Sequence, residues 1–215
     1  MQSFVQTISL ALFCLVLAAC QSAYYGAWEK VGVHKRDILV DRVEDAREAQ
    51  EDGQKQFKSA LAEFKSVTAF DGGDLEKRYE ALESEYEASE RAATEIRDRI
   101  DAVDNVAKAL FKEWRAELKE YTNPRLKADS ERQLKATESR YRELLAAMKN
   151  AERSIDPVLG ALKDHVLYLK HNLNARAIAS LQGEVRTIDR DVDKLIADMQ
   201  RAIQEADRFL AQLGQ

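Results

Sequence analysis

Apolar residues recur in this chain at alternating spacings of four and three, which is the stripe that forms the seam of a coiled coil. The longest series is Leu75, Tyr79, Leu82, Tyr86, Ser89, Ala93, Ile96, Ile100, Val103, Ala107, Leu110, Trp114, Glu117, Tyr121. Twelve of its fourteen members are apolar or aromatic, against 45% of the whole chain. A second series, Leu181, Val185, Ile188, Val192, Leu195, Met199, Ala202, Ala206, Phe209, Leu213, is apolar throughout. This spacing predicts long, amphipathic helices.

Two weaker series of the same spacing cover the rest of the chain. They are Leu39, Val43, Ala46, Gln50, Gly53, Phe57, Ala60, Phe64, Val67 and Leu134, Thr137, Tyr141, Leu144, Met148, Ala151, Ile155. No strand-like alternation of useful length competes with them, and the chain has only two prolines among its many Ala, Glu, Lys, Leu and Arg residues. We therefore expect an all-α protein.

Local signals predict where the helices are interrupted. Residues 71–74, Asp-Gly-Gly-Asp, favour a turn with Asp74 as the N-cap of the next helix. Asn123 followed by Pro124 is a cap with proline at the first helical position. Pro157 either starts a helix or kinks a continuing one, and the asparagines around Asn172 permit a turn without requiring it.

These signals predict helices at residues 33–67 and 75–121, a third helix from Pro124, and a last helix that ends near Leu213. Because the connections are short, consecutive helices must be antiparallel. We expect an elongated antiparallel bundle or coiled coil of three to five long helices, with four favoured. The second helix has more residues than the first, so it should extend past the start of the first.

The N-terminal residues form a separate signal. Residues 1–19 contain no charged side chain, and their apolar stretch is too short for a comfortable membrane span. Leu17-Ala18-Ala19-Cys20 resembles the lipobox of bacterial lipoproteins, in which the cysteine thiol receives diacylglycerol and the chain is cut before it. The alternative is an uncleaved anchor helix.

The resemblance implies a signal peptide at residues 1–19, a lipidated Cys20 with a short tether at 20–32, and one helical domain at 33–215. The remaining cysteine, Cys14, would be removed with the signal, so the body would need no disulfide. Gln21, rather than an aspartate, follows Cys20, which by resemblance to enterobacterial sorting favours the outer membrane, with the body facing the periplasm.

Aromatic residues predict a cluster at the membrane-proximal end of the bundle. Trp114 and Tyr121 lie in the last turns of the second predicted helix, near where Tyr24, Tyr25 and Trp28 must lie. One interpretation is contact with the lipid interface, where Trp and Tyr are favoured. The other, which we favour, is a hydrophobic plug that closes the bundle.

The stretch 167–181 is apolar on more than one face and contains Asn172, Asn174 and Arg176. A helix that is apolar nearly all round is usually buried, so a central helix whose polar groups satisfy a turn is the favoured interpretation. The alternative is a surface that binds a partner through these three residues.

Sequence motifs for catalysis or cofactor binding are not found. The histidines His34, His165 and His171 have no ligand spacing, and neither a phosphate-binding loop nor a nucleophile elbow occurs. The formal net charge of −5 disfavours a nucleic-acid binder. We expect neither an enzyme nor a cofactor or metal.

Residues 32–46 and 168–184, with Gly72-Gly73-Asp74-Leu75-Glu76-Lys77 between them, resemble a proteobacterial family catalogued only as a domain of unknown function. Its members are lipoproteins or secreted proteins with predicted coiled coils. The resemblance covers essentially the whole chain after the signal, and implies localisation and fold but no activity.

The leading functional hypothesis is a non-enzymatic, lipid-anchored scaffold or adaptor that binds a protein of the cell envelope. The alternative is a bundle that holds a hydrophobic or lipid ligand between its helices, for which a cavity beside Gly160 and Gly183 would speak. A heptad seam can also pair between chains, so self-association is a further expectation.

Overall fold

A computed structural model describes residues 34–70, 72 and 74–213. In this part of the chain the elements are α2 (Lys35–Thr68), α3 (Leu75–Glu117), α4 (Pro124–His171), α5 (Ala175–Gln182) and α6 (Val185–Leu213), and there is no strand. The prediction of an all-α bundle is therefore confirmed. None of these helices is both long and apolar enough to cross a membrane.

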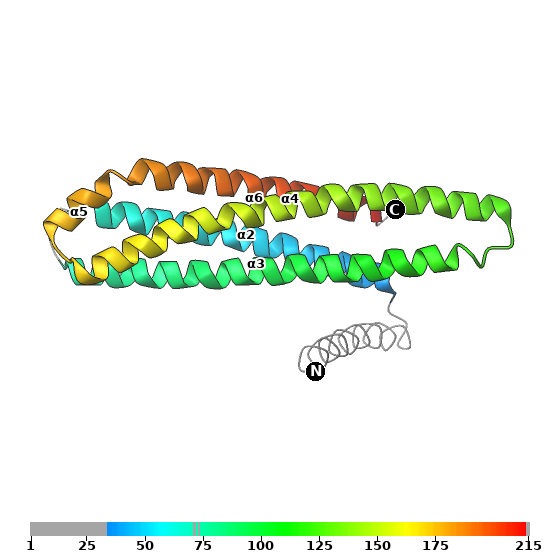
Figure 1. Ribbon diagram of the computed structural model, residues 1–215, viewed down its shortest axis with the longest axis horizontal. Helices are drawn as coiled ribbons and strands as arrows, with labels where there is room; N and C mark the ends of the chain where they lie inside the picture. Colours follow the sequence, from blue (N-terminus) through cyan, green and yellow to red (C-terminus); the bar gives the residue numbers. More distant parts are fainter. Residues whose placement is uncertain (1–33, 71, 73, 214–215) are drawn as a thin grey trace, which may run out of the picture.

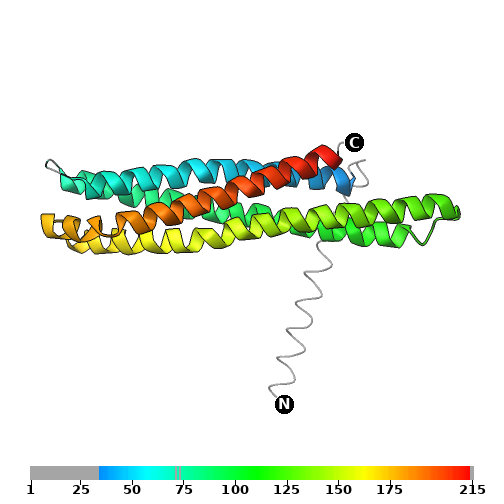
Figure 2. The same ribbon diagram turned by 90° about the horizontal axis from the view of Figure 1, so that it is seen from above.

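The four long helices pack side by side in an up-down-up-down arrangement (Figures 1 and 2). Each is antiparallel to the two it contacts: α2 packs against α3 and α6, and α4 packs against α3 and α6. The short α5 lies at the end of the bundle where α2 meets α3. With 48 residues, α4 is about 72 Å long, so the molecule is a rod.

The predicted seam forms the core of the rod. The largest fully buried side chains come from all four long helices and are Phe57, Phe64, Leu39, Leu82, Ile96, Ile100, Leu144, Met148, Ile155, Leu162, Leu169 and Ile188. Gly53, at a seam position of α2, is also buried, and a Cβ there would lie 2.6 Å from Cδ1 of Ile96. The glycine lets α2 and α3 approach closely at this height.

The helix ends largely follow the predicted signals. Asp74 accepts a hydrogen bond from the backbone N–H of Lys77, and Gly72 supplies a φ of 144°, which L side chains rarely adopt. Asn123 caps α4 through the N–H groups of Arg125 and Leu126. These caps set the two hairpin turns.

One predicted boundary is wrong: α3 ends at Glu117, so Tyr121 lies in the connection and not in the last helical turn. The chain must reverse before the Asn123–Pro124 cap, and a residue preceding proline is driven towards extended backbone. Asn123 has φ −90° and ψ 112° accordingly.

The two open questions along α4 are resolved. Pro157 lies inside α4 on its exposed side, where the backbone carbonyl that loses its helical partner can face water, so the helix continues through it. The chain does break after His171, because the side chain of Asn174 caps the new helix α5. A further break at Gly183 was not predicted, since the apolar series runs on without interruption across it.

Helix α3 extends past the start of α2, as predicted, and α4 accompanies it. The α3–α4 hairpin continues past the start of α2 and the end of α6 (Figure 1). Lys35, the first residue of α2, pairs with Glu113 near the end of α3 at 3.0 Å. The rod therefore has four helices over most of its length and two helices at this end, which we call the proximal end.

Candidate functional site

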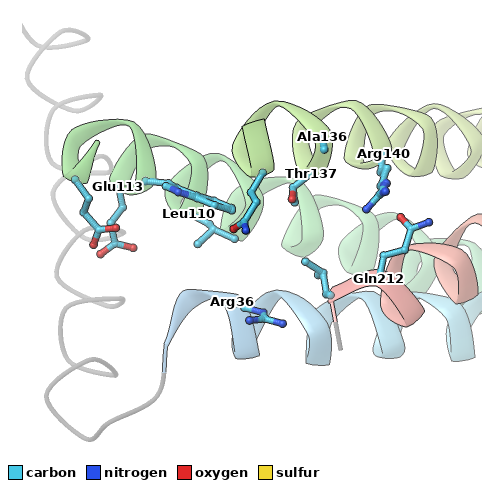
Figure 3. Close-up of a pocket in the computed structure, with 11 residues that line it drawn as sticks. Arg36, Leu110, Glu113, Ala136, Thr137, Arg140 and Gln212 are labelled. Atoms are coloured by element: carbon cyan, nitrogen blue, oxygen red, sulfur yellow. The ribbon is translucent and has the colours of Figure 1, made fainter. Parts of the chain in front are cut away.

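The proximal end contains a cleft of about 640 Å³ at the step from four helices to two. All four long helices contribute to its lining, and Figure 3 shows several of the side chains converging on it. The lining residues are Arg36 from α2, Leu110, Glu113, Trp114 and Glu117 from α3, Gln133, Ala136, Thr137 and Arg140 from α4, and Gln212 and Leu213 from α6.

The floor of this proximal cleft is apolar. Leu110, Trp114 and Leu213 are each half-buried and pack against the hydrophobic core. Trp114 is held in place because its indole N–H donates to Oγ of Ser130 at 2.7 Å, and Ser130 itself is buried. The polar edge of the indole is thus satisfied within the protein.

The charged side chains at the rim fall into two groups. Glu113 is paired with Lys35, whereas Arg36, Arg140 and the carboxylate Glu117 have no ion-pair partner among the described residues. The cleft therefore combines an apolar floor with two guanidinium groups and one carboxylate at its rim. That combination can bind an apolar segment or molecule that also carries charged groups.

A polar and aromatic cluster joins three helices beside the cleft. Tyr141 of α4 donates its hydroxyl hydrogen to Asp104 of α3 at 2.7 Å, and its ring lies against Phe111 and Phe209, with ring centres 5.4 and 6.4 Å away. Burial and the neighbouring Asp104 carboxylate raise the pKa of Tyr141, so it remains a hydroxyl donor.

The predicted aromatic cluster is described only in part. Tyr24, Tyr25 and Trp28 lie outside the described residues, as does the predicted lipidation site Cys20. Of the other two members, Trp114 is half-buried in the proximal cleft, and Tyr121 is 41% exposed on the connection between α3 and α4. Both lie towards the proximal end.

At the opposite, distal end, the three polar residues singled out in the sequence lie around the break between α4 and α5. Asn174 accepts hydrogen bonds from the N–H groups of Arg176 and Ala177, and the side-chain amide of Asn172 donates to the carbonyl of Tyr168. Arg176 is exposed. Both asparagine side chains therefore stabilise the turn by hydrogen bonds to backbone groups, whereas Arg176 faces solvent.

Three large apolar side chains are exposed around the same distal turn. Leu167 is 49% exposed, and Tyr168 and Leu173 are each 39% exposed. The sequence placed these residues in a stretch expected to be buried, because it is apolar on more than one face. At this end the neighbouring helices cover α4 on one face only, so the apolar side chains on its other face remain exposed.

A Ser–Lys–Asp group in mid-bundle, in which Ser154 and Asp198 are buried and Lys194 is exposed, was not singled out from the sequence. Lys194 of α6 donates to Oγ of Ser154 at 2.6 Å, and Ser154 donates to Asp198 at 2.5 Å. The serine hydrogen is thus committed to a carboxylate, and Lys194 is also paired with Asp198 at 2.9 Å. Because the charges of Lys194 and Asp198 compensate each other, the group serves to tie α4 to α6. It lacks the free base that would activate Ser154 as a nucleophile.

Histidine and carboxylate side chains do not converge in the described part of the chain. His165 is buried, with its ring 4.8 Å from that of Phe64, and His171 is exposed. No group of three or more His, Cys, Asp or Glu side chains suited to a metal ion occurs among these residues.

Comparison with known proteins identifies the family of the chain. A family model described as "Protein of unknown function (DUF2959)" matches residues 24–213 of the chain. No curated protein matches it. The match covers the whole bundle and also ten residues that precede the described part.

Proposed function

Since the chain belongs to the family described as Protein of unknown function (DUF2959), we propose a role from its geometry: a non-enzymatic, lipid-anchored scaffold or adaptor rod of the periplasm. The observation that carries this proposal is the packed rod itself. Its core is filled by large apolar side chains from all four long helices, and α4 spans about 72 Å. Such a body presents surfaces at a fixed distance from its anchor.

The placement of the two ends supports an anchored rod. The predicted lipid-bearing Cys20 precedes Lys35, the first residue of α2, by fifteen residues, and α2 begins near the proximal end. The distal end, with exposed Leu167, Tyr168 and Leu173, lies at the far end of the rod. An anchor on Cys20, in the outer membrane, leaves the distal end to bind an envelope protein.

The packing of the core weighs against the alternative, a bundle that holds a hydrophobic ligand between its helices. Gly160 and Gly183 are both exposed, and a Cβ at Gly160 would meet nothing within 4 Å. Neither glycine therefore borders a space inside the bundle. Gly160 and Gly183, which could have left room for a ligand in the core, lie on the surface of the bundle instead.

The anchor is tested by the intact mass and membrane fractionation of the native protein beside a Cys20→Ala variant. We expect the native chain to start at Cys20, to carry the added mass of diacylglycerol and acyl chains such as palmitate, and to fractionate with the outer membrane. The variant should lose both the added mass and the membrane association. A native chain that keeps residues 1–19 without lipid would contradict the proposal.

The adaptor role is tested by placing a photo-reactive phenylalanine at Tyr168 in the distal patch. The matched control places it at Arg142, which is exposed on the shaft of the same helix. We expect one discrete cross-linked species at Tyr168 that is weak or missing at Arg142. Equal cross-linking at the two positions, or none at either, would count against a partner at the distal end.

A further inference from the structure

At the proximal cleft the bundle lacks the helices that cover its apolar side chains elsewhere. Where α2 begins and α6 ends, the inner sides of α3 and α4 lose their covering helices, yet Leu110, Trp114 and Leu213 still present apolar surface there. Exposed apolar surface of this kind is stabilised when another segment covers it. Such a segment must be able to reach the cleft.

We propose that the chain's own residues 24–33 occupy this cleft, with Tyr24, Tyr25 and Trp28 seated on its apolar floor. These three aromatic residues fall within a stretch of five and directly precede the domain. Their rings would lie beside Trp114, the only other tryptophan of the chain. Aromatic rings in contact add to the gain from burial alone.

The point of attachment favours this occupant over any separate molecule. Arg36, in the first turn of α2, is itself part of the rim, so the chain reaches α2 from the cleft's own edge. Ten residues span at most about 35 Å when extended and about 15 Å as a helix. The part of α3 to be covered, from Leu110 to Glu117, is about 11 Å long. The segment is therefore long enough in either form.

The extent of the family match supports the same assignment. The match begins at residue 24, although the described fold begins at residue 34. A plain spacer between an anchor and a domain needs no particular sequence, because only its length and stiffness matter. The inclusion of residues 24–33 fits a segment that packs against the domain.

Charge complementarity points the same way. Arg36 and Arg140 at the rim have no ion-pair partner among the described residues, and Glu29 lies in the middle of the segment. Lys30 is its neighbour, and Glu117 is a carboxylate on the opposite rim. The segment thus offers a carboxylate, Glu29, to the arginines of the rim and an ammonium group, Lys30, to Glu117.

Binding of residues 24–33 in the cleft would shorten the free part of the tether between Cys20 and α2. Of the residues between Cys20 and α2, only 21–23 would remain free, so a rod anchored at Cys20, as proposed above, would be held at a set orientation. This consequence depends on the lipid anchor, whereas the seating itself does not.

The seating is tested by cysteine cross-linking in the full chain in its own membranes. Ala27→Cys is combined with Ala136→Cys, which lines the cleft, and a short bismaleimide joins the thiols. The matched control pairs Ala27→Cys with Lys135→Cys, which has the same height on α4 but does not line the cleft. Peptide mass spectrometry identifies the joined residues, so native Cys14 and Cys20 do not confuse the result.

We expect the link between positions 27 and 136 to exceed that between 27 and 135 by roughly tenfold, within one chain, because a seated segment has a high local concentration at one face. Adding Tyr25→Ser and Trp28→Ser should reduce the yield to that of the control while circular dichroism remains helical. Equal yields in the two pairs, a yield unchanged by the serine variants, or links between two chains would each overturn the proposal. Acylation of Cys20 is read separately, by intact mass.

Discussion

The hydrogen bond from Tyr141 to Asp104 joins α4 to α3 in a partly buried setting. Burial alone would raise the pKa of Asp104, but the hydrogen bonds from Lys108 and Tyr141 outweigh it and hold the pKa below its ordinary value. A carboxylate with a lowered folded-state pKa stabilises the fold above its unfolded pKa, and this contribution is lost as the pH falls through the folded value.

Tyr141→Phe keeps the ring between Phe111 and Phe209 but removes this donor. We expect the free energy of unfolding to fall by about 1–2 kcal/mol at neutral pH, since hydrogen bonds to charged groups are worth this much when partly shielded. The deficit should shrink as the pH falls through the lowered pKa of the Asp104 carboxyl, because the carboxylate that accepts the hydrogen bond is then protonated. Urea titrations at several pH values measure it, and a deficit that is independent of pH would contradict the assignment. Asp104→Asn is the control.

Gln50 is a polar residue in the middle of the core. Its side chain is fully buried, and neither its Nε2 nor its Oε1 has a hydrogen-bond partner in the structure described. It occupies a seam position of α2, where a buried polar residue lowers stability and can help to select one register of the helices.

Gln50→Met is expected to raise the free energy of unfolding by about 1–3 kcal/mol, because it replaces an unsatisfied buried amide with an apolar chain of similar shape. Thermal and urea unfolding measure this change. An unchanged or lower stability would show that the amide is satisfied by bound water. Leu134→Met, at a buried seam position that is already apolar, is the control.

The short helix α5 depends on its cap more than the long helices do. Eight residues cannot sustain a helix alone, and only two residues, Gly183 and Glu184, separate it from α6. Gln182 also donates to the carbonyl of Thr68 at 3.1 Å, which ties α5 to the end of α2. We therefore regard α5 as a lid on the distal end that the cap at Asn174 holds in place.

Asn174→Ala should cost about 1 kcal/mol, because two backbone N–H groups lose their acceptor. The effect should be local: faster amide hydrogen exchange at Ala177 and Ile178, with little change in the middle of α2. Asn174→Asp keeps the acceptor and should exchange as the native chain does. Protection that is unchanged in Asn174→Ala would mean that packing alone holds α5.

The whole molecule is expected to behave in solution as a rod. The length of α4, about 72 Å, implies a radius of gyration of about 22 Å for the bundle. A compact protein of the same chain length would have about 16 Å. Small-angle X-ray scattering of the chain from Gln21 onward, over a concentration series, distinguishes the two values. A radius that grows with concentration would reveal self-association.

The helical class, the order of the long helices and most of their ends could be predicted from the sequence. Heptad spacing reports which residues share a face of a helix, and caps such as Asp74 and Asn123 act on neighbouring backbone groups. The overhang of α3 could be predicted as well, because it follows from counting residues between turns. Each of these features depends on residues close together along the chain.

Contacts between distant residues could not be predicted in the same way. The partners of Tyr141, the isolation of the Gln50 amide and the lining of the proximal cleft all depend on which heights of separate helices meet. The break at Gly183 likewise follows from the need of α6 to return along the bundle, although its apolar series shows no interruption. Periodicity assigns each residue a face, but the neighbour on that face is set by the packing of all four helices together.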